Sequence, residues 1–402
     1  PLRRQRQMCI RDRSCFMHVA FQIVLFWSLL FGIAHGLHSS AKESKTDLSN
    51  EWPHHRGDPA LQGLSNAALG NQISLQWVFK TGEFLKSSVV VSNGLAFVGS
   101  DLGVLHAINL QSGKEKWNFK TDMAIEAPPL VHNGMVYIGS TDGFLYALQA
   151  DSGKLVWKYE TDGEIMGAAN YAVRPKTKDE VIVVGSYDNF VHCMDAKTGK
   201  KIWKFETQNY VNGVPTIFDQ SYVVFGGCDS MLYIIGMEDG KAVRSVEVEA
   251  PIAASVAVAD GVGYVGNMDR SVMAFDLTTG SQVWSYKQKS FPYFSSPAVN
   301  KDTVFIGGRD KGLHAIDRVT GKQKWRFAAR GRVDSSPVLA RDTLVFGSMD
   351  GKLYLLSAQT GKEITSYEIG ESISSTPAIT KDKIIVGCED GKVYAFQVDS
   401  KR

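Results

Sequence analysis

A glycine recurs at a nearly constant interval through most of this chain, and this repeat is the feature that most restricts its fold. The glycine ends a short apolar run such as "VYIGS", and successive copies are 40, 46, 41, 40, 41, 40 and 40 residues apart. The longer interval contains a polar insertion, Arg174–Glu180. A period near 40 residues indicates that each repeat is one supersecondary unit, stacked against its neighbours. The members of this column are Gly99, Gly139, Gly185, Gly226, Gly266, Gly307, Gly347 and Gly387.

Each repeat predicts four short strands separated by turns. The first lies near Ser295–Val299 in one copy, and the other three correspond to segments such as "VYIGS", "LYAL" and "KLVWKYE". Asp142-Gly143 is typical of a tight hairpin, because both central residues need a positive φ that glycine and Asx residues tolerate. Gly153 in "ADSGK" stands where a type I turn with a bulge needs a left-handed residue. No helical periodicity of useful length appears after Leu37.

A second column places an aromatic residue four residues after a Gly, and this residue is Trp in most repeats, with Arg244 and Thr365 as the exceptions. Four strands per repeat of about 41 residues predict the blades of a β-propeller. The last repeat ends after its third strand, Val393–Gln397, and Leu75–Lys80 supplies the missing fourth strand, which closes the ring and leaves no open edge. The fold prediction is all-β: a single eight-bladed propeller over 73–398, after a lead-in at 37–72 and before a tail at 399–402. The tryptophans of the second column, which we interpret as structural residues, are Trp77, Trp117, Trp157, Trp203, Trp284 and Trp325.

The N-terminal residues are treated separately from the fold. Residues 1–13 match nothing downstream and look like a translated adaptor, so we treat them as a non-native leader; a genuine basic signal n-region is the alternative. They carry five Arg and one Asp, so the net charge of +2 becomes −2 without them. Neither value predicts a nucleic-acid partner.

An apolar run of about 16 residues, Val19–Ala34, followed by Ala34-His35-Gly36, predicts a cleaved signal peptide at 14–36 and an exported protein, periplasmic or extracellular. The alternative is an uncleaved anchor, although a membrane span needs about 20 apolar residues. Three cysteines follow the signal, Cys193, Cys228 and Cys388. They are odd in number and fall in three different repeats, so we expect free thiols rather than a disulfide framework.

Three further segments carry a family resemblance. "AFDLTTGSQVW" (Ala274–Trp284), "AIDRVTGKQKW" (Ala315–Trp325) and the lead-in "EWPHHRGDPALQG" together resemble the tryptophan-docking repeat of the quinoprotein, or PQQ-like, propeller family. The resemblance covers essentially the whole mature chain and implies eight blades. One branch of the family holds PQQ-dependent dehydrogenases, which are longer and carry a catalytic Asp, calcium ligands and often a vicinal disulfide. The other holds compact scaffolds such as the barrel-assembly lipoprotein of the bacterial outer membrane.

The present chain fits the compact branch in size and blade number. It has no Cys-Cys pair and one short insertion, but also no cysteine placed for lipidation after the apolar run. We therefore expect a non-catalytic, monomeric scaffold that binds an envelope protein or polymer at one rim, possesses no cofactor and meets a membrane only through partners or an uncleaved signal. The alternatives are a small PQQ- and calcium-dependent oxidoreductase and a glycan-binding module.

The binding residues are sought where the repeat varies. First strands face the channel of a propeller, and the column that includes Leu85 and Ile125 is uniformly apolar apart from one Tyr, whereas the two positions flanking it vary in charge and size. These varied columns predict a polar and aromatic rim for a ligand or peptide; a water-filled mouth with paired charges is the alternative. The candidates are Lys86, Glu126, Glu164, Tyr210, Asn212, Phe294, Arg332 and Asp334.

No catalytic or metal site is predicted. His106, His192 and His314 occupy one repeated position in three separate blades and cannot converge on one ion. His54 and His55 have no nearby Cys or carboxylate partners in the sequence pattern. Because the remaining carboxylates and hydroxyls recur for structural reasons, no acid–base or nucleophile constellation can be inferred from them.

Overall fold

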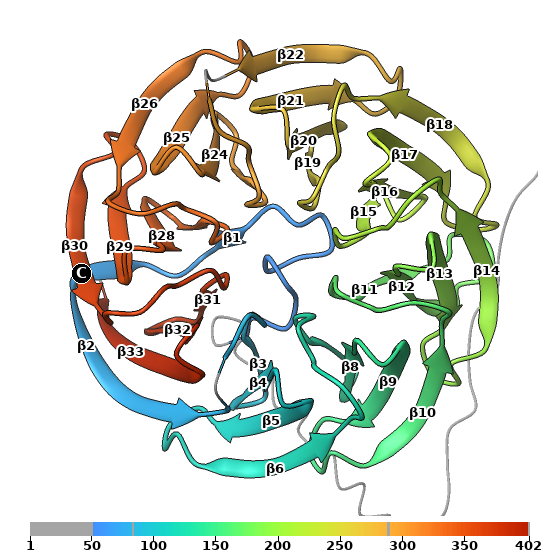
Figure 1. Cartoon of the computed structure of the whole chain (residues 1–402), viewed down its shortest axis with the longest axis horizontal. Coiled ribbons are helices and arrows are strands. Elements are labelled where there is room, and N and C mark those ends of the chain that lie inside the picture. The colour runs from blue at the N-terminus through green and yellow to red at the C-terminus, as the bar shows by residue number, and fades with distance from the viewer. Residues whose placement is uncertain (1–50, 83, 288–289, 401–402) are drawn as a thin grey trace, which may run out of the picture. The chain divides into compact units, whose positions relative to one another are not determined.

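The computed structural model describes residues 51–82, 84–287 and 290–400, and this part of the chain contains strands and turns but no helix. Eight sheets surround a common axis, as Figure 1 shows. The prediction of an eight-bladed all-β propeller is therefore confirmed. The expectations for the leader and the signal peptide lie outside the described residues.

Each of the first seven blades is an antiparallel meander whose strands follow one another from the axis outward. The strands of blades 1 to 4 are β3 (Val90–Ser92), β4 (Leu95–Gly99), β5 (Val104–Asn109) and β6 (Glu115–Lys120); β7 (Leu130–His132), β8 (Met135–Gly139), β9 (Phe144–Gln149) and β10 (Leu155–Glu160); β11 (Asn170–Val173), β12 (Glu180–Gly185), β13 (Phe190–Asp195) and β14 (Lys201–Glu206); and β15 (Thr216–Phe218), β16 (Tyr222–Gly226), β17 (Met231–Gly236) and β18 (Ala242–Glu247).

The strands of blades 5 to 8 follow the same plan. They are β19 (Ala257–Ala259), β20 (Val262–Gly266), β21 (Ser271–Asp276) and β22 (Gln282–Lys287); β23 (Ala298–Val299), β24 (Thr303–Gly308), β25 (Gly312–Asp317) and β26 (Gln323–Ala328); β27 (Val338–Ala340), β28 (Thr343–Gly347), β29 (Lys352–Ser357) and β30 (Glu363–Glu368); and β31 (Ala378–Ile379), β32 (Lys383–Cys388) and β33 (Lys392–Ser400), with β2 (Leu69–Lys80) from the N-terminal side.

The ring closes between the two ends of the described chain. Strand β2 pairs antiparallel with β33 as the outer strand of blade 8, with Trp77 opposite Ala395 and Phe79 opposite Val393. Figure 1 shows β2, in blue, beside the red β33. This is the closure predicted from the missing fourth strand. It joins blade 8 to the start of the chain, so unwinding either end would expose a sheet edge.

The repeated glycines and tryptophans are packing residues. Gly139 ends β8 where Ile165 of the next blade crosses, and a Cβ there would collide with the Ile165 side chain. The indole N–H of Trp157 donates to the carbonyl of Ala196 in the next blade at 3.1 Å, while Gly199 lies against the face of the same indole. Each repeat needs these contacts to stack on its neighbour, which is why the columns recur.

The lead-in segment 52–65 lines the inside of the ring. Trp52 pairs with Val91 in blade 1, and the carbonyls of Pro53, Ala60 and Gly63 accept bonds from the first strands of blades 2, 5 and 7. Strand β1 (Leu64–Ser65) then pairs parallel with β27. Figure 1 shows the blue segment crossing the centre of the ring. One short stretch of chain thus ties together blades that are far apart in sequence.

Two side chains of this segment fill the centre. Arg56 is 0% exposed and donates to the carbonyls of Pro337 at 2.7 Å and Pro297 at 2.9 Å, in blades 7 and 6. Leu61 is 1% exposed and packs on Ala168 and Val214 from blades 3 and 4. The Arg56-Gly57-Asp58 tripeptide is therefore held inside the fold. The three cysteines are free thiols, as expected.

Candidate functional site

The candidate rim residues lie in the links, by which we mean the segments that connect the fourth strand of one blade to the first strand of the next. The prediction that they lie on the first strands is wrong. Strand β3 begins at Val90, four residues after Lys86, and β27 begins at Val338, four residues after Asp334. The Ser-Ser-Pro stretch between them forms hydrogen bonds with neighbouring blades instead; Ser296 N, for example, donates to Ser336 Oγ at 2.9 Å. The links carry the candidates across one end of the ring, next to the hairpins that join second and third strands.

A second variable column lies beside these links and was missed by the sequence analysis. In seven blades its backbone N–H donates to the carbonyl of a link residue, as in Tyr187 to Glu164, Cys228 to Tyr210 and Arg309 to Pro292. It occupies the third position of hairpins such as "GSTDG", where the glycine and the Asp are nearly constant. Its variation within a repeated turn was the available signal. Its members are Asp101, Thr141, Tyr187, Cys228, Met268, Arg309, Met349 and Glu389.

We call the surface formed by both sets of residues the hairpin rim, and its first group is an ion pair. Lys86 Nζ and Glu126 Oε1 are 2.9 Å apart, on the links of blades 1 and 2. The Lys86 ammonium also lies 5.8 Å from the centre of the Phe84 ring. Both partners are partly exposed, so the pair contributes about 1 kcal/mol or less to stability. The pair is accessible to a partner protein, so either side chain can replace the Lys86–Glu126 ion pair by a bond to that partner.

The second group is aromatic and acidic. The rings of Tyr187 and Tyr210 stack with centroids 4.6 Å apart and 8° between their planes, and Tyr210 is 46% exposed. Burial raises the pKa of Tyr187, and Cys228, Glu164 and Glu126 raise it further. Within the described part of the chain the Glu164 side chain has no hydrogen-bond or ion-pair partner. An exposed tyrosine stack beside an unpaired carboxylate offers both apolar contact and hydrogen bonding.

Asn212 continues this group by donating from Nδ2 to the sulfur of Cys228 at 3.0 Å. Burial is the main cause that raises the pKa of the Cys228 thiol, and the neighbouring charge of Asp229 raises this pKa further. The thiol is therefore protonated at neutral pH, since an unperturbed cysteine already titrates near pH 8.5. This excludes it as an activated nucleophile and leaves it as a small packing residue.

The third group lies on blades 6 and 7 and is built around Arg309. Its guanidinium forms two bonds of 3.0 Å to the carboxylate of Asp334, Nε to Oδ1 and Nη2 to Oδ2. The same guanidinium stacks 3.7 Å from the centre of the Phe294 ring. Arg332 lies two residues before Asp334 on the same link. It is exposed and has no side-chain partner among the described residues. This side of the rim is therefore the one with a free cation.

The structure thus places six of the eight predicted residues in separate small groups rather than in one cluster. Lys86 contacts Glu126, Asp334 and Phe294 both contact Arg309, and Tyr210 and Asn212 meet the hairpin residues Tyr187 and Cys228. Glu164 and Arg332 remain unpaired on different sides of the axis. The other end of the ring is occupied by the lead-in 52–65, so the chain's own residues fill the axis behind the hairpin rim.

A quinone cofactor of the PQQ type would need a calcium ion, and the rim would have to supply its oxygen ligands. Calcium takes six to eight oxygen ligands. Among the described residues no group of three or more His, Cys, Asp or Glu side chains is placed to hold a metal. At the rim, Glu126 is paired with Lys86, Asp334 with Arg309, and Glu389 with Ser374 at 2.6 Å. The two rim carboxylates without a partner in the described part of the chain, Asp101 and Glu164, lie on blades 1 and 3. The described rim therefore does not fit a calcium-bound cofactor.

The fold and the rim define a compact propeller whose variable residues lie at one end. The chain belongs to the family described as "Outer membrane protein assembly factor BamB", whose model matches residues 64–192, 187–295 and 293–401. No curated protein sequence matches it. In the described residues, no helix is long and apolar enough to cross a membrane.

Three solved structures share the fold. BamB from Moraxella catarrhalis is 18% identical with a TM-score of 0.70, covering 81% of this chain and 100% of its own. The quinohemoprotein alcohol dehydrogenase ADHIIG from Pseudomonas putida HK5 is 13% identical with a TM-score of 0.73, covering 88% and 81%. A europium-containing methanol dehydrogenase is 14% identical with a TM-score of 0.73, covering 87% and 98%. These identities establish a common architecture alone.

Proposed function

We propose that this chain is an exported, non-catalytic scaffold that binds a protein of the bacterial cell envelope through its hairpin rim. The observation that carries the proposal is the concentration of non-repeating residues at that rim, above all the exposed Tyr187–Tyr210 stack. Tyrosine and arginine are enriched among the residues that dominate binding energy in protein interfaces. The rim supplies both, with Arg309 and Arg332 across the axis from the tyrosines.

The family description supports the same direction, because it names an outer-membrane assembly factor. Fold alone does not determine function, and the chemistry of the rim residues is the specific support for a binding role. The rim has an unpaired carboxylate on one side and an unpaired guanidinium on the other. A partner segment with a basic and an acidic end would satisfy both, and such complementarity sets orientation as well as encounter rate.

Site-specific photo-crosslinking in bacterial cells with an intact envelope tests this proposal. A photoreactive residue at Tyr210 or Arg332 is expected to form an adduct with one envelope protein, identified by mass spectrometry. Lys154, exposed on the turn between β9 and β10 at the opposite face, is the matched control position. Equal adducts from Lys154, or none from the rim, would exclude the rim as the binding surface.

The affinity of each variant for the purified partner then measures how much a rim residue contributes to binding. Tyr187→Ala is expected to weaken binding about tenfold or more, which is about 1.4 kcal/mol, while Lys154→Ala leaves it unchanged. If instead the purified protein oxidised alcohols or sugars when supplied with PQQ, calcium and an artificial electron acceptor, the non-catalytic assignment would be wrong.

A further inference from the structure

Two grooves open between neighbouring blades on the face opposite the hairpin rim. One lies between blades 6 and 7 with a volume of about 550 Å³, and the other between blades 1 and 2 with about 480 Å³. They are built from corresponding positions, since Phe305, Lys324 and Ala358 of the first groove match Phe97, Lys116 and Ala150 of the second. The repeated positions therefore form each groove, and the residues that vary between blades determine which ligand it can bind.

Each groove lies at a joint, the contact between two neighbouring blades, where the side chain at one repeated position is small. This position follows the third strand of each blade, and in most joints its carbonyl accepts the docking indole N–H, as Ala358 does from Trp325 and Ala150 from Trp117, both at 3.1 Å. In four other joints the position carries a long side chain, which is buried in three of them and 11% exposed in the case of Arg318. Those residues are Leu110, Met237, Leu277 and Arg318.

Ala196 is the third small residue, but its joint is bridged by other groups. Tyr137 OH donates to the Ala196 carbonyl at 3.1 Å, and Asn133 Nδ2 donates to Glu180 at 2.8 Å across the same joint. The corresponding residue in the groove between blades 6 and 7 is Phe305, which has no hydroxyl to extend. The alanine at 358 therefore leaves space that its own neighbours do not use.

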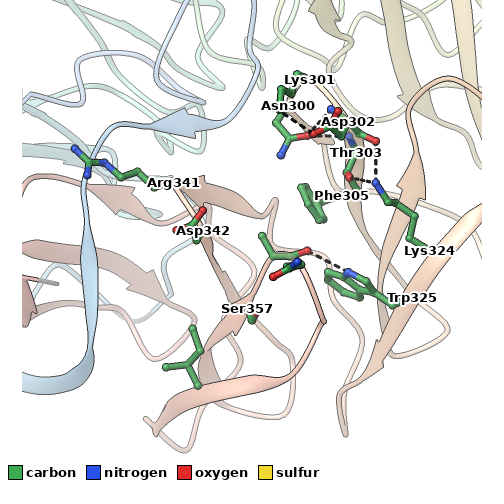
Figure 2. A pocket seen from close by; sticks show the side chains of 13 residues that line it. Asn300, Lys301, Asp302, Thr303, Phe305, Lys324, Trp325, Arg341, Asp342 and Ser357 are labelled. Carbon is green, nitrogen blue, oxygen red and sulfur yellow. Dashed lines mark hydrogen bonds and ion pairs between the residues drawn. The ribbon is translucent and has the colours of Figure 1, made fainter. Parts of the chain in front are cut away.

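The groove between blades 6 and 7 combines aromatic rings with free polar groups. Figure 2 shows Phe305 between the Asn300–Thr303 hairpin and Ser357, with Lys324 and Trp325 to one side and Asp342 to the other. Lys324 Nζ donates to Thr303 Oγ1 at 3.0 Å and to the carbonyl of Asp302 at 3.3 Å, which leaves one N–H of the ammonium. The same nitrogen lies 4.0 Å from Oδ2 of Asp317.

Three polar side chains along the groove retain unused capacity. Asn300 uses its Oδ1 to accept from the backbone N–H groups of Asp302 and Thr303, which leaves its amide donors free. The carboxylate of Asp342 and the amide of Gln359, which also lines the groove, have no side-chain partner within the described residues.

These groups select for a neutral ligand with several hydroxyls. The lining carries charges of both signs, with Lys301, Lys324 and Arg341 as the cations and Asp302 and Asp342 as the anions. A ligand with a net charge of either sign therefore meets repulsion as well as attraction. A hydroxyl donates to a carboxylate and accepts from an ammonium or amide, so a polyol satisfies both. The partly exposed Trp325 supplies apolar contact for its carbon skeleton, and the Phe305 ring is buried beneath the groove. We propose that this groove binds a neutral sugar residue of a glycan.

The groove between blades 1 and 2 provides a comparison within the same molecule. Ser92 stands there for Asn300, Leu95 for Thr303 and Gly134 for Asp342, and Met135 adds to its apolar lining. It has a similar size and polar residues of its own, but it has no amide at the position of Asn300 and no carboxylate at the position of Asp342. Its polar residues are Asn93, Gln149 and Asp151. We expect no sugar affinity there.

Saturation-transfer NMR and calorimetry with neutral sugars test the proposal on the full chain. The probes are maltotriose, cellobiose and N,N′-diacetylchitobiose, followed by a neutral-glycan array, with glucose 6-phosphate and glucosamine as the charged comparisons. At least one neutral sugar is expected to bind in preference to both charged ones. Preference for a charged sugar, or no neutral sugar binding in solution or on the array, would overturn the assignment.

Two variants locate the site. Ala358→Leu fills the groove with a side chain that Leu110 and Leu277 already place at this position, and Asp342→Asn removes the carboxylate charge without filling it. Both are expected to weaken sugar affinity about tenfold or more. Ala150→Leu, the same change in the other groove, is the matched control and should leave affinity unchanged.

Equal loss with Ala150→Leu, or full affinity in both Ala358→Leu and Asp342→Asn, would contradict the proposed location. Circular dichroism and the melting temperature check that each variant folds. Tyr187→Ala at the hairpin rim should not alter sugar binding, because it lies at the opposite face. The sugar site and the protein-binding rim can therefore fail independently.

Discussion

The guanidinium of Arg56 lies against Gly63 inside the ring, in the space that a side chain at residue 63 would occupy. Gly63 also has a φ of 68°, which disfavours any other residue. From this position Arg56 reaches the carbonyls of Pro297 and Pro337 and links blades 6 and 7 to the lead-in. The absent side chain at Gly63 is what allows a charged residue to lie on the axis.

Replacing Arg56 should destabilise the propeller strongly. Arg56→Ala leaves two buried carbonyls without their donor and a cavity on the axis, for an expected loss of about 3 kcal/mol or more. Burial lowers the pKa of Arg56 to about 9, with Asp58 opposing the shift, so the guanidinium is charged at neutral pH. Urea unfolding followed by tryptophan fluorescence measures the change.

Arg330→Ala is the matched control for Arg56, because Arg330 is exposed and its side chain makes no bond within the described residues. Its effect should be within about 0.5 kcal/mol. An Arg56→Ala protein as stable as Arg330→Ala would show that the lead-in does not hold blades 6 and 7 together.

The docking glycines allow backbone strain and indole packing to be separated. Gly153 and Gly134 have φ values of 70° and 74°, but a Cβ on Gly153 would meet the Trp117 ring, whereas nothing lies within 4 Å of one on Gly134. Alanine at either position costs about 1–2 kcal/mol in backbone strain. Gly153→Ala should cost about 1–3 kcal/mol more through overpacking.

Thermal or urea unfolding of the two single variants, side by side, measures this difference. If Gly134→Ala were as destabilising as Gly153→Ala, the glycine column would be explained by φ alone, and the indole contact would be incidental.

The sequence predicted the elements that recur. Gly139 and Trp157 belong to columns whose spacing revealed four-stranded units, and the missing strand after Gln397 indicated where Trp77 had to pair. Repetition made these inferences possible, because each contact is sampled once per blade. The lead-in is different: it occurs once and binds the first strands mainly through its backbone carbonyls, which leave no side-chain pattern. Its course inside the ring could not be predicted.

The rim was predicted in part for a related reason. Lys86 and Tyr210 were found because their columns vary beside a uniform apolar one. Tyr187 and Arg309 were missed because they stand in a hairpin whose constant Gly and Asp suggested turn chemistry alone. Recognising them requires knowing that each link crosses beside the hairpin, which is a tertiary relationship and not a local one.

The joint between blades 4 and 5 lacks its docking tryptophan and should be improvable. Arg244 stands in that column, packs its Cδ against Gly280 and donates from Nη2 to Thr278 O at 2.6 Å. Arg244→Trp should stabilise the protein by about 1 kcal/mol, because an indole buries more apolar surface there. A differential scanning experiment would register this as a higher melting temperature.

The reciprocal change is its control. Trp284 is buried in the next joint and donates to Arg318 O at 2.9 Å, so Trp284→Arg should lower stability by about 2 kcal/mol or more. A stabilising Trp284→Arg, or a destabilising Arg244→Trp, would show that the two joints do not pack equivalently.

His54 should make stability depend on pH. It is 8% exposed, its ring lies 5.1 Å from that of Tyr171, and burial, with a smaller contribution from the charge of His132, lowers its pKa to about 4. Between pH of about 6.5 and 4 the unfolded chain binds a proton at this residue and the native protein does not. The free energy of unfolding therefore falls as pH decreases through that window, by at most about 3 kcal/mol from this group.

His54→Phe removes the titrating group while keeping a ring against Tyr171. Urea unfolding at pH values of about 7, 6 and 5 should show a smaller loss of stability in the variant than in the unsubstituted protein. Asp58, whose pKa is raised mainly by burial, acts in the opposite direction, but it is present in both proteins and cancels in the difference. Tyr171→Phe keeps His54 and should retain the full slope. Equal slopes for His54→Phe and the unsubstituted protein would mean that His54 is protonated in the folded ring and that its charge is accommodated there.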